Sequence, residues 1–127
     1  MDIEDAIVTR LAAQVTSLND KIYPASDVPI KVTAPYCVYQ RIGTSRYETL
    51  TEAGSYEPSF QFTVYNTTYT NMRSLRKLVR ECFEDELGEY ASEAPYVQRV
   101  TIESEIDGYN SETHEHEGIL EISFFYN

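Results

Sequence analysis

The longest regular pattern in the chain is a strand that runs almost directly into a helix. Apolar side chains alternate with polar ones at Phe60, Phe62 and Val64, which is the period of a half-buried strand. After residues 66–68 the period changes, and from Tyr69 to about Leu87 apolar residues recur at steps of three and four. This apolar stripe consists of Met72, Leu75, Leu78, Val79, Cys82 and Phe83. A strand with one apolar face followed by a helix with one apolar stripe predicts a two-layer α+β core.

The flanking segments predict a first helix and the rest of the sheet. A helix is expected from about Ile3 to Leu18, with Asp2 as its N-terminal cap. Extended segments are expected at 21–23, 36–42, 96–107 and 119–126, in addition to 60–65. The predicted fold class is therefore α+β, with a single antiparallel-rich β-sheet and two helices packed on one face. The predicted order is α-β-β-β-α-β-β.

The strand at 96–107 alternates cleanly and predicts one apolar and one acidic face. Val100, Ile102 and Ile106 are expected to face the core. The other face would carry Arg99, Thr101, Glu103, Glu105 and Asp107. We take Glu103, Glu105 and Asp107 as a candidate solvent-facing acidic surface.

Residues 1–127 are expected to form one domain, because this length supports a core without disulfides or metals. The polar segment at about 43–58 is expected to extend two antiparallel strands into a hairpin arm. One interpretation is a flexible loop, and the other is an arm that becomes ordered against a neighbouring subunit. In the second interpretation Arg46, Tyr47 and Tyr56 are candidate interface residues.

Charge divides the chain into two unequal parts. Residues 1–80 hold 8 acidic and 9 basic residues, whereas residues 81–127 hold 13 acidic residues and one base, Arg99. An acidic surplus argues against binding to nucleic acid through phosphate contacts and against an anionic membrane surface. It remains compatible with a wall that nucleic acid slides past, because like charges prevent adhesion.

No pattern in the sequence indicates catalysis or a bound cofactor. His114 and His116 could form a two-ligand metal site with Glu112 or Glu117, but their acidic, loop-like context favours a solvated turn. Cys37 and Cys82 lie among apolar residues and are expected to be buried free thiols in a reducing compartment. The acidic N-terminus is unlike a secretory signal. We expect no catalytic residues, no metal and no cofactor.

A row of basic residues lies on one side of the central helix. Arg73, Arg76, Lys77 and Arg80 occupy a stripe roughly 100° wide at about 100° per residue. One interpretation is a solvated face, partly neutralised by Glu81 and Glu84 one turn further on. The other is a subunit interface that meets the acidic last third of another copy, as a head-to-tail ring requires.

Several segments together resemble a known family. They are Asp2 to Ile7 (DIEDAI), Ile22 to Pro24 (IYP), Pro35 to Ile42 (PYCVYQRI), and Phe60 to Tyr65 (FQFTVY) running into the helix that begins at Tyr69. In order and length the chain is similar to the tail completion proteins of long-tailed bacteriophages, the tail-terminator or tail-to-head joining group. The histidine-bearing turn and the arm carry no signature of that family.

The resemblance implies a structural virion protein that is not an enzyme. Such proteins form hexameric rings at the head-proximal end of the tail tube, stop tube elongation and join the tail to the head connector. The implied partners are other copies of the chain, the tail tube protein and a head completion or connector protein. DNA would pass through the bore without specific binding, and Glu103, Glu105 and Asp107 would suit the bore wall. The implied location is the tail or neck of the virion, after assembly in the host cytoplasm.

Two alternatives stay open at the level of sequence. Another neck or tail-tube ring component would share the α+β fold and the ring symmetry. From a different class, a small ligand-binding or regulatory α+β domain would use one face of the sheet as a pocket.

Overall fold

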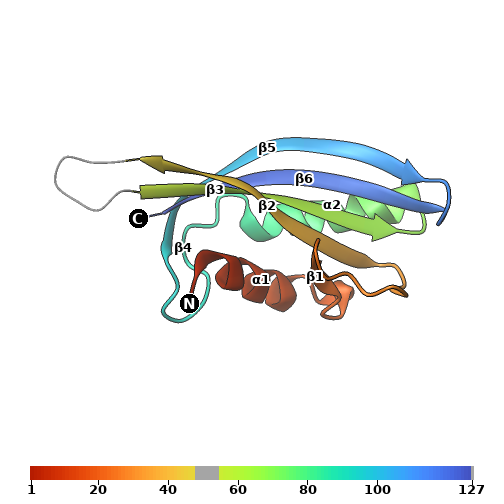
Figure 1. Cartoon of the computed structure of the whole chain (residues 1–127), viewed down its shortest axis with the longest axis horizontal. Coiled ribbons are helices and arrows are strands. Elements are labelled where there is room, and N and C mark those ends of the chain that lie inside the picture. Colours follow the sequence, from red (N-terminus) through yellow and green to blue (C-terminus); the bar gives the residue numbers. More distant parts are fainter. Residues whose placement is uncertain (48–54, 127) are drawn as a thin grey trace.

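The computed structural model describes residues 1–47 and 55–126 and contains two helices on one side of a single sheet (Figure 1). The elements are α1 (Ile3–Gln14), a 3-10 turn (Thr16–Leu18), β1 (Ile22–Pro24), β2 (Tyr36–Tyr47), β3 (Ser55–Asn66), α2 (Tyr69–Phe83), β4 (Gly88–Glu89), β5 (Tyr96–Asn110) and β6 (Glu115–Tyr126). The predicted α+β class is confirmed. The predicted order lacked the two-residue strand β4 and the separate 3-10 turn after α1.

The sheet has six strands in the order β1-β2-β3-β6-β5-β4. Strand β1 runs parallel to β2, and every other neighbouring pair is antiparallel. The outermost strands are short: β1 pairs only with residues 37–39 of β2, and β4 pairs only with residues 96–97 of β5. The long strands β2, β3, β6 and β5 therefore form the body of the sheet.

Side-chain caps fix where the two helices begin. The Asp2 carboxylate accepts a hydrogen bond from the Asp5 backbone N–H at 2.8 Å, as predicted. In the same way the Thr68 hydroxyl accepts from the backbone N–H of Asn71 at 3.1 Å. The first helix is shorter than predicted. It ends at Gln14 and is followed by the 3-10 turn. The run Val15-Thr16-Ser17 has low helix propensity, and Asn19 with φ 51° ends the turn.

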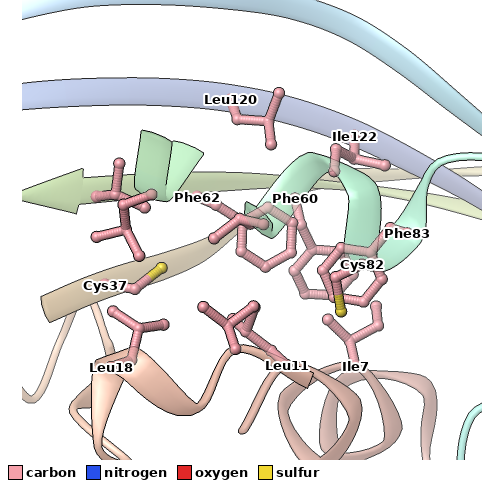
Figure 2. Packing of buried hydrophobic residues seen from close by; sticks show 14 of the residues in the cluster. Ile7, Leu11, Leu18, Cys37, Phe60, Phe62, Cys82, Phe83, Leu120 and Ile122 are labelled. Atoms are coloured by element: carbon pink, nitrogen blue, oxygen red, sulfur yellow. The ribbon is translucent and has the colours of Figure 1, made fainter. Parts of the chain in front are cut away.

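One apolar core fills the space between the helices and the sheet. Figure 2 shows Ile7 and Leu11 of α1 below Phe60 and Phe62 of β3, with Phe83 of α2 beside them. The Phe62 and Phe83 rings stack with centroids 5.4 Å apart, and Phe124 meets Phe83 edge-on at 5.2 Å. Both helices thus bury their apolar stripes against the same face of the sheet.

Helix α2 lies so close to β6 that one position excludes a side chain. A Cβ atom added at Gly118 would lie 2.6 Å from Met72 Sδ and 3.0 Å from a methyl group of Val64. The apolar stripe predicted for α2 is buried as expected, with one exception. Leu78 is 47% exposed. By helical geometry Leu78 lies on the flank of the stripe, beside exposed positions of the helix.

Candidate functional site

A bulge in β5 changes which face carries the acidic residues. The register against β6 shifts between Ile102 and Ser104, so that Ile102 pairs with Ile122 but Glu105 pairs with Leu120. Paired residues share a face, and Leu120 and Ile122 are both buried under the helices. Beyond the bulge every side chain therefore lies on the opposite face from the one predicted.

The predicted common face of Glu103, Glu105 and Asp107 is therefore wrong. Glu105 and Asp107 lie on the helix-bearing face, where Asp107 pairs with Gly118 of β6. Ile106 was expected in the core but is 50% exposed on the other face. Only Glu103, at the bulge itself, stays on the helix-free side, where the Ser123 hydroxyl donates to its carboxylate at 3.0 Å. Whether any of the three lines a bore stays a prediction.

Two arginines of the basic stripe bind these relocated carboxylates within the same chain. The Arg76 guanidinium pairs with the Asp107 carboxylate and donates to the Ile106 carbonyl at 3.0 Å. The Arg80 Nη1 atom donates to Glu105 Oε1 at 2.7 Å. Its Nε atom lies 3.1 Å from Glu84 Oε2 without hydrogen-bond alignment. We call the contacts of Arg76 and Arg80 with β5 the α2–β5 latch.

The α2–β5 latch alters the titration of Asp107. The hydrogen bond from Arg76, together with its positive charge and a hydrogen bond from the Tyr69 hydroxyl, lowers the pKa of Asp107. Arg76 is the more enclosed partner, with 12% of its side chain exposed against 47% for Asp107. A largely enclosed guanidinium bound to its own chain has its charge already compensated.

The other two basic residues of the stripe remain open to solvent. The Arg73 guanidinium carbon lies 5.5 Å from the centroid of the Tyr69 ring, which is within the range of a cation–π contact. The Lys77 ammonium is 3.8 Å from Glu81, and 67% of its side chain is exposed. The predicted interface role of the stripe stays a prediction, and the structure leaves Arg73 and Lys77 available for it.

The arm residues of the candidate interface lie at the edge of what the structure describes. Backbone pairing continues along the arm, with Arg46 opposite Tyr56 and Tyr47 opposite Ser55. The Tyr56 ring stacks on Tyr126 of β6 with centroids 5.7 Å apart. The tip of the arm, residues 48–54, lies outside the described residues, and the predicted contact of the arm with a neighbouring subunit stays a prediction.

The helix-free face of the sheet carries a second acidic surface that the sequence analysis missed. Side chains that alternate with the buried ones on β3, β5 and β6 point away from both helices. Five carboxylates share this face: Glu57, Glu103, Glu115, Glu117 and Glu121. We call this set the acidic sheet face. Its one base on these strands is Arg99, which pairs with Glu57 at 2.7 Å.

The signal for the acidic sheet face was present in the sequence. Leu120, Ile122 and Phe124 alternate along the expected strand at 119–126, so Glu121 between Leu120 and Ile122 has to point to the other face. The β5 bulge, in contrast, has no sequence signature that we can identify.

The two histidines contact Tyr109, and the two cysteines are buried. His114 Nδ1 lies 3.2 Å from the Tyr109 hydroxyl, and the His116 ring packs against the same tyrosine at 4.8 Å. Residues 1–47 and 55–126 contain no group of three or more His, Cys, Asp or Glu that could hold a metal ion. Both thiols are free, and burial raises the pKa of Cys37 to about 12 and that of Cys82 to about 11.

No helix in the described ranges is both long and apolar enough to cross a membrane.

Comparison with known proteins gives a clear structural likeness and no sequence match. No protein-family model matches the chain, and no curated protein matches it by sequence. Among solved structures, a chain from the virion of a native gene transfer agent particle superposes with a TM-score of 0.76. The match covers 98% of this chain and 93% of that chain at 13% sequence identity. At this identity the likeness establishes a shared fold, and the chain has the fold of a component of that virion.

Proposed function

We propose that this protein is a structural component of a phage-like virion that forms a ring at the head-proximal end of the tail tube. The ring stops tube elongation and joins the tail to the head connector. The observation that carries this proposal is the superposition, over nearly the full length of both chains, on a component of a gene transfer agent virion. The segments that resemble tail completion proteins give it the more specific position at the end of the tail.

The charges of the molecule support a ring through which DNA passes. The five carboxylates of the acidic sheet face repel phosphate, and its one arginine, Arg99, is already paired with Glu57. A bore wall of this kind would let DNA slide without adhering. On this proposal the acidic sheet face takes the role that the sequence analysis gave to Glu103, Glu105 and Asp107.

The chemistry of the described residues supports an assembly role more than a ligand-binding one. A hollow of about 350 Å³ is lined by charged and hydroxyl side chains of α2 and by Glu105. Small-molecule sites are mostly apolar with a few polar groups, which this hollow is not. We therefore favour a virion protein over a small ligand-binding or regulatory domain.

Electron microscopy of particles assembled without this protein tests the proposal. Overlong tubes without heads are expected, because nothing would stop tube growth or attach a head. Tubes of normal length without heads would reduce the role to head joining and would refute termination. Normal tailed particles would refute the proposal altogether. Adding the purified protein back should restore normal length in newly assembled tails.

A further inference from the structure

The solvent side of α2 forms one wall of a polar hollow beside β5. The hollow has a volume of about 350 Å³ and is lined by α2 from Thr70 to Arg80 and by Glu105 of β5. Arg76 and Arg80 form its floor, and the α2–β5 latch holds them there. The open rim consists of Thr70, Arg73, Ser74 and Lys77, which recur at steps of three, one and three on one helical stripe. We call these four residues the α2 rim.

The α2 rim offers hydrogen-bond donors and positive charge. All four of its side chains are exposed. Arg73 has no carboxylate partner among the described residues, and Lys77 holds Glu81 only loosely at 3.8 Å. Such a rim matches a segment that presents carboxylates. The ligand class is therefore acidic.

The chain itself carries such a segment immediately beyond the same helix. Residues 81–95 contain six acidic residues and no base. Three of the six are engaged within the chain, since Glu81, Glu84 and Glu86 lie near Lys77, Arg80 and Arg10. The remaining three, Asp85, Glu89 and Glu93, are exposed and have no ion-pair partner in the described ranges.

An exposed apolar side chain lies in the middle of this acidic connection. Leu87 is 56% exposed, between Asp85 and Glu89. A matching residue lies beside the α2 rim, where Leu78 is 47% exposed. Protein interfaces combine a small apolar centre with a polar border. We call Asp85, Leu87, Glu89 and Glu93 the acidic knob.

We propose that the α2 rim of one copy binds the acidic knob of the next copy in a head-to-tail contact. The rim lies on the first turns of α2 and the knob follows its C-terminal end, and α2 runs along the length of the molecule in Figure 1. Asp85 and Glu89 pair with Lys77 and Arg73, and Leu87 packs on Leu78. Contacts between two different patches repeat from copy to copy and close into a ring when the rotation allows. This inference rests on the proposed ring and names the contact that builds it.

Charge reversal on each surface provides the test, because opposite reversals should complement each other. The rim variant is Arg73→Glu/Lys77→Glu, and the knob variant is Asp85→Lys/Glu89→Lys. Each variant alone is expected to lose self-association by more than tenfold, because its two contact surfaces now carry like charges. In an equimolar mixture the reversed rim of the rim variant can meet the reversed knob of the knob variant. The native rim of the knob variant can likewise meet the native knob of the rim variant. The mixture should therefore associate again, in alternating order.

Mass measurement by light scattering and counting of capped tail tubes by electron microscopy give the readout. Capped tubes are counted because a ring subunit can stay monomeric until it meets the tube. The variant Lys21→Glu/Lys31→Glu changes net charge as the rim variant does, and it should assemble normally. Thermal unfolding midpoints of all variants should stay close to that of the wild type, since the α2–β5 latch is untouched.

The outcomes separate the contact from the function. If the wild type caps tubes and both variants also do so, the proposed contact is wrong while the ring function stands. If each variant fails but the mixture does not recover, the two surfaces do not meet and the contact is again wrong. A stable closed dimer of the wild type would also overturn the head-to-tail arrangement. If the wild type neither caps tubes nor changes their length, the proposed function itself fails.

Discussion

The α2–β5 latch predicts that Arg76 contributes to folding stability. The variant Arg76→Met removes the guanidinium but keeps an apolar stem of similar length. It deletes the charged hydrogen bond to Asp107 and the hydrogen bond to the Ile106 carbonyl. Hydrogen bonds to charged groups contribute about 1.5 to 3 kcal/mol, and exposure of the partner reduces this. Because 47% of the Asp107 side chain is exposed, we expect a loss of about 1 to 2 kcal/mol.

Thermal unfolding of the wild type and the variant measures this loss. For a chain of this length the midpoint should fall by about 4 to 8 °C. Arg73→Met is the matched control, on the same helix and with the guanidinium over an exposed ring. Its expected loss is at most about 0.5 to 1 kcal/mol. Equal losses of stability in the two variants would refute the reasoning, because the α2–β5 latch would then contribute no stability in solution.

The pH dependence gives a second check on the same prediction. Asp107 has a lowered pKa in the folded state, so the latch contributes its full stability above the ordinary pKa of an aspartate. That contribution is lost as the pH falls through the lowered pKa of the folded state, because Asp107 is then protonated in both states. The difference in the free energy of unfolding between the wild type and Arg76→Met should therefore become smaller in acid. If this difference stays constant down to the lowest pH at which the protein folds, Asp107 is not the residue that Arg76 stabilises.

Three further predictions follow from the packing, the thiols and the acidic sheet face. Gly118→Ala should cost about 1 to 3 kcal/mol of stability, since its Cβ would lie 2.6 Å from Met72 Sδ; Gly43→Ala, where nothing lies within 4 Å, is the control and should unfold at the wild-type midpoint. Cys37, which is buried and has its pKa raised to about 12, should resist thiol reagents at neutral pH in the native protein and react after unfolding; rapid native labelling at Cys37 would contradict the packing. Duplex DNA should show no measurable affinity at physiological salt, and tight, salt-sensitive binding would contradict the role of the acidic sheet face.

The helices and their caps illustrate what sequence reasoning can recover. The Asp2 cap and the apolar stripe of α2 follow from residues within a few positions of one another, so local pattern is sufficient to predict them. The end of α1 was misplaced by four residues because Leu18 continues the apolar period and is indeed buried. Burial of Leu18 is achieved by a 3-10 turn, and the period alone does not distinguish this from a continued helix.

The candidate surfaces illustrate what sequence reasoning could not recover. Alternation along β5 predicted three acidic residues on one face, and a single inserted residue at the bulge moved Glu105 and Asp107 to the other. The same change brings Asp107 and Glu105 into contact with Arg76 and Arg80 of the basic stripe. Pairing register between strands depends on residues far apart in the chain, so a count along one strand does not reveal it.

The sequence by itself therefore determined the class of the fold, the order of its main elements and the apolar residues that join helices to sheet. These features depend on local periodicity, on capping side chains and on the need to bury apolar surface. Tertiary structure decided which charges are compensated within the chain and which remain exposed to solvent. The reason is that an ion pair needs two side chains on one face at hydrogen-bond distance. In this molecule a bulge between Ile102 and Ser104 brings Asp107 to Arg76 and leaves Arg73 and Lys77 exposed.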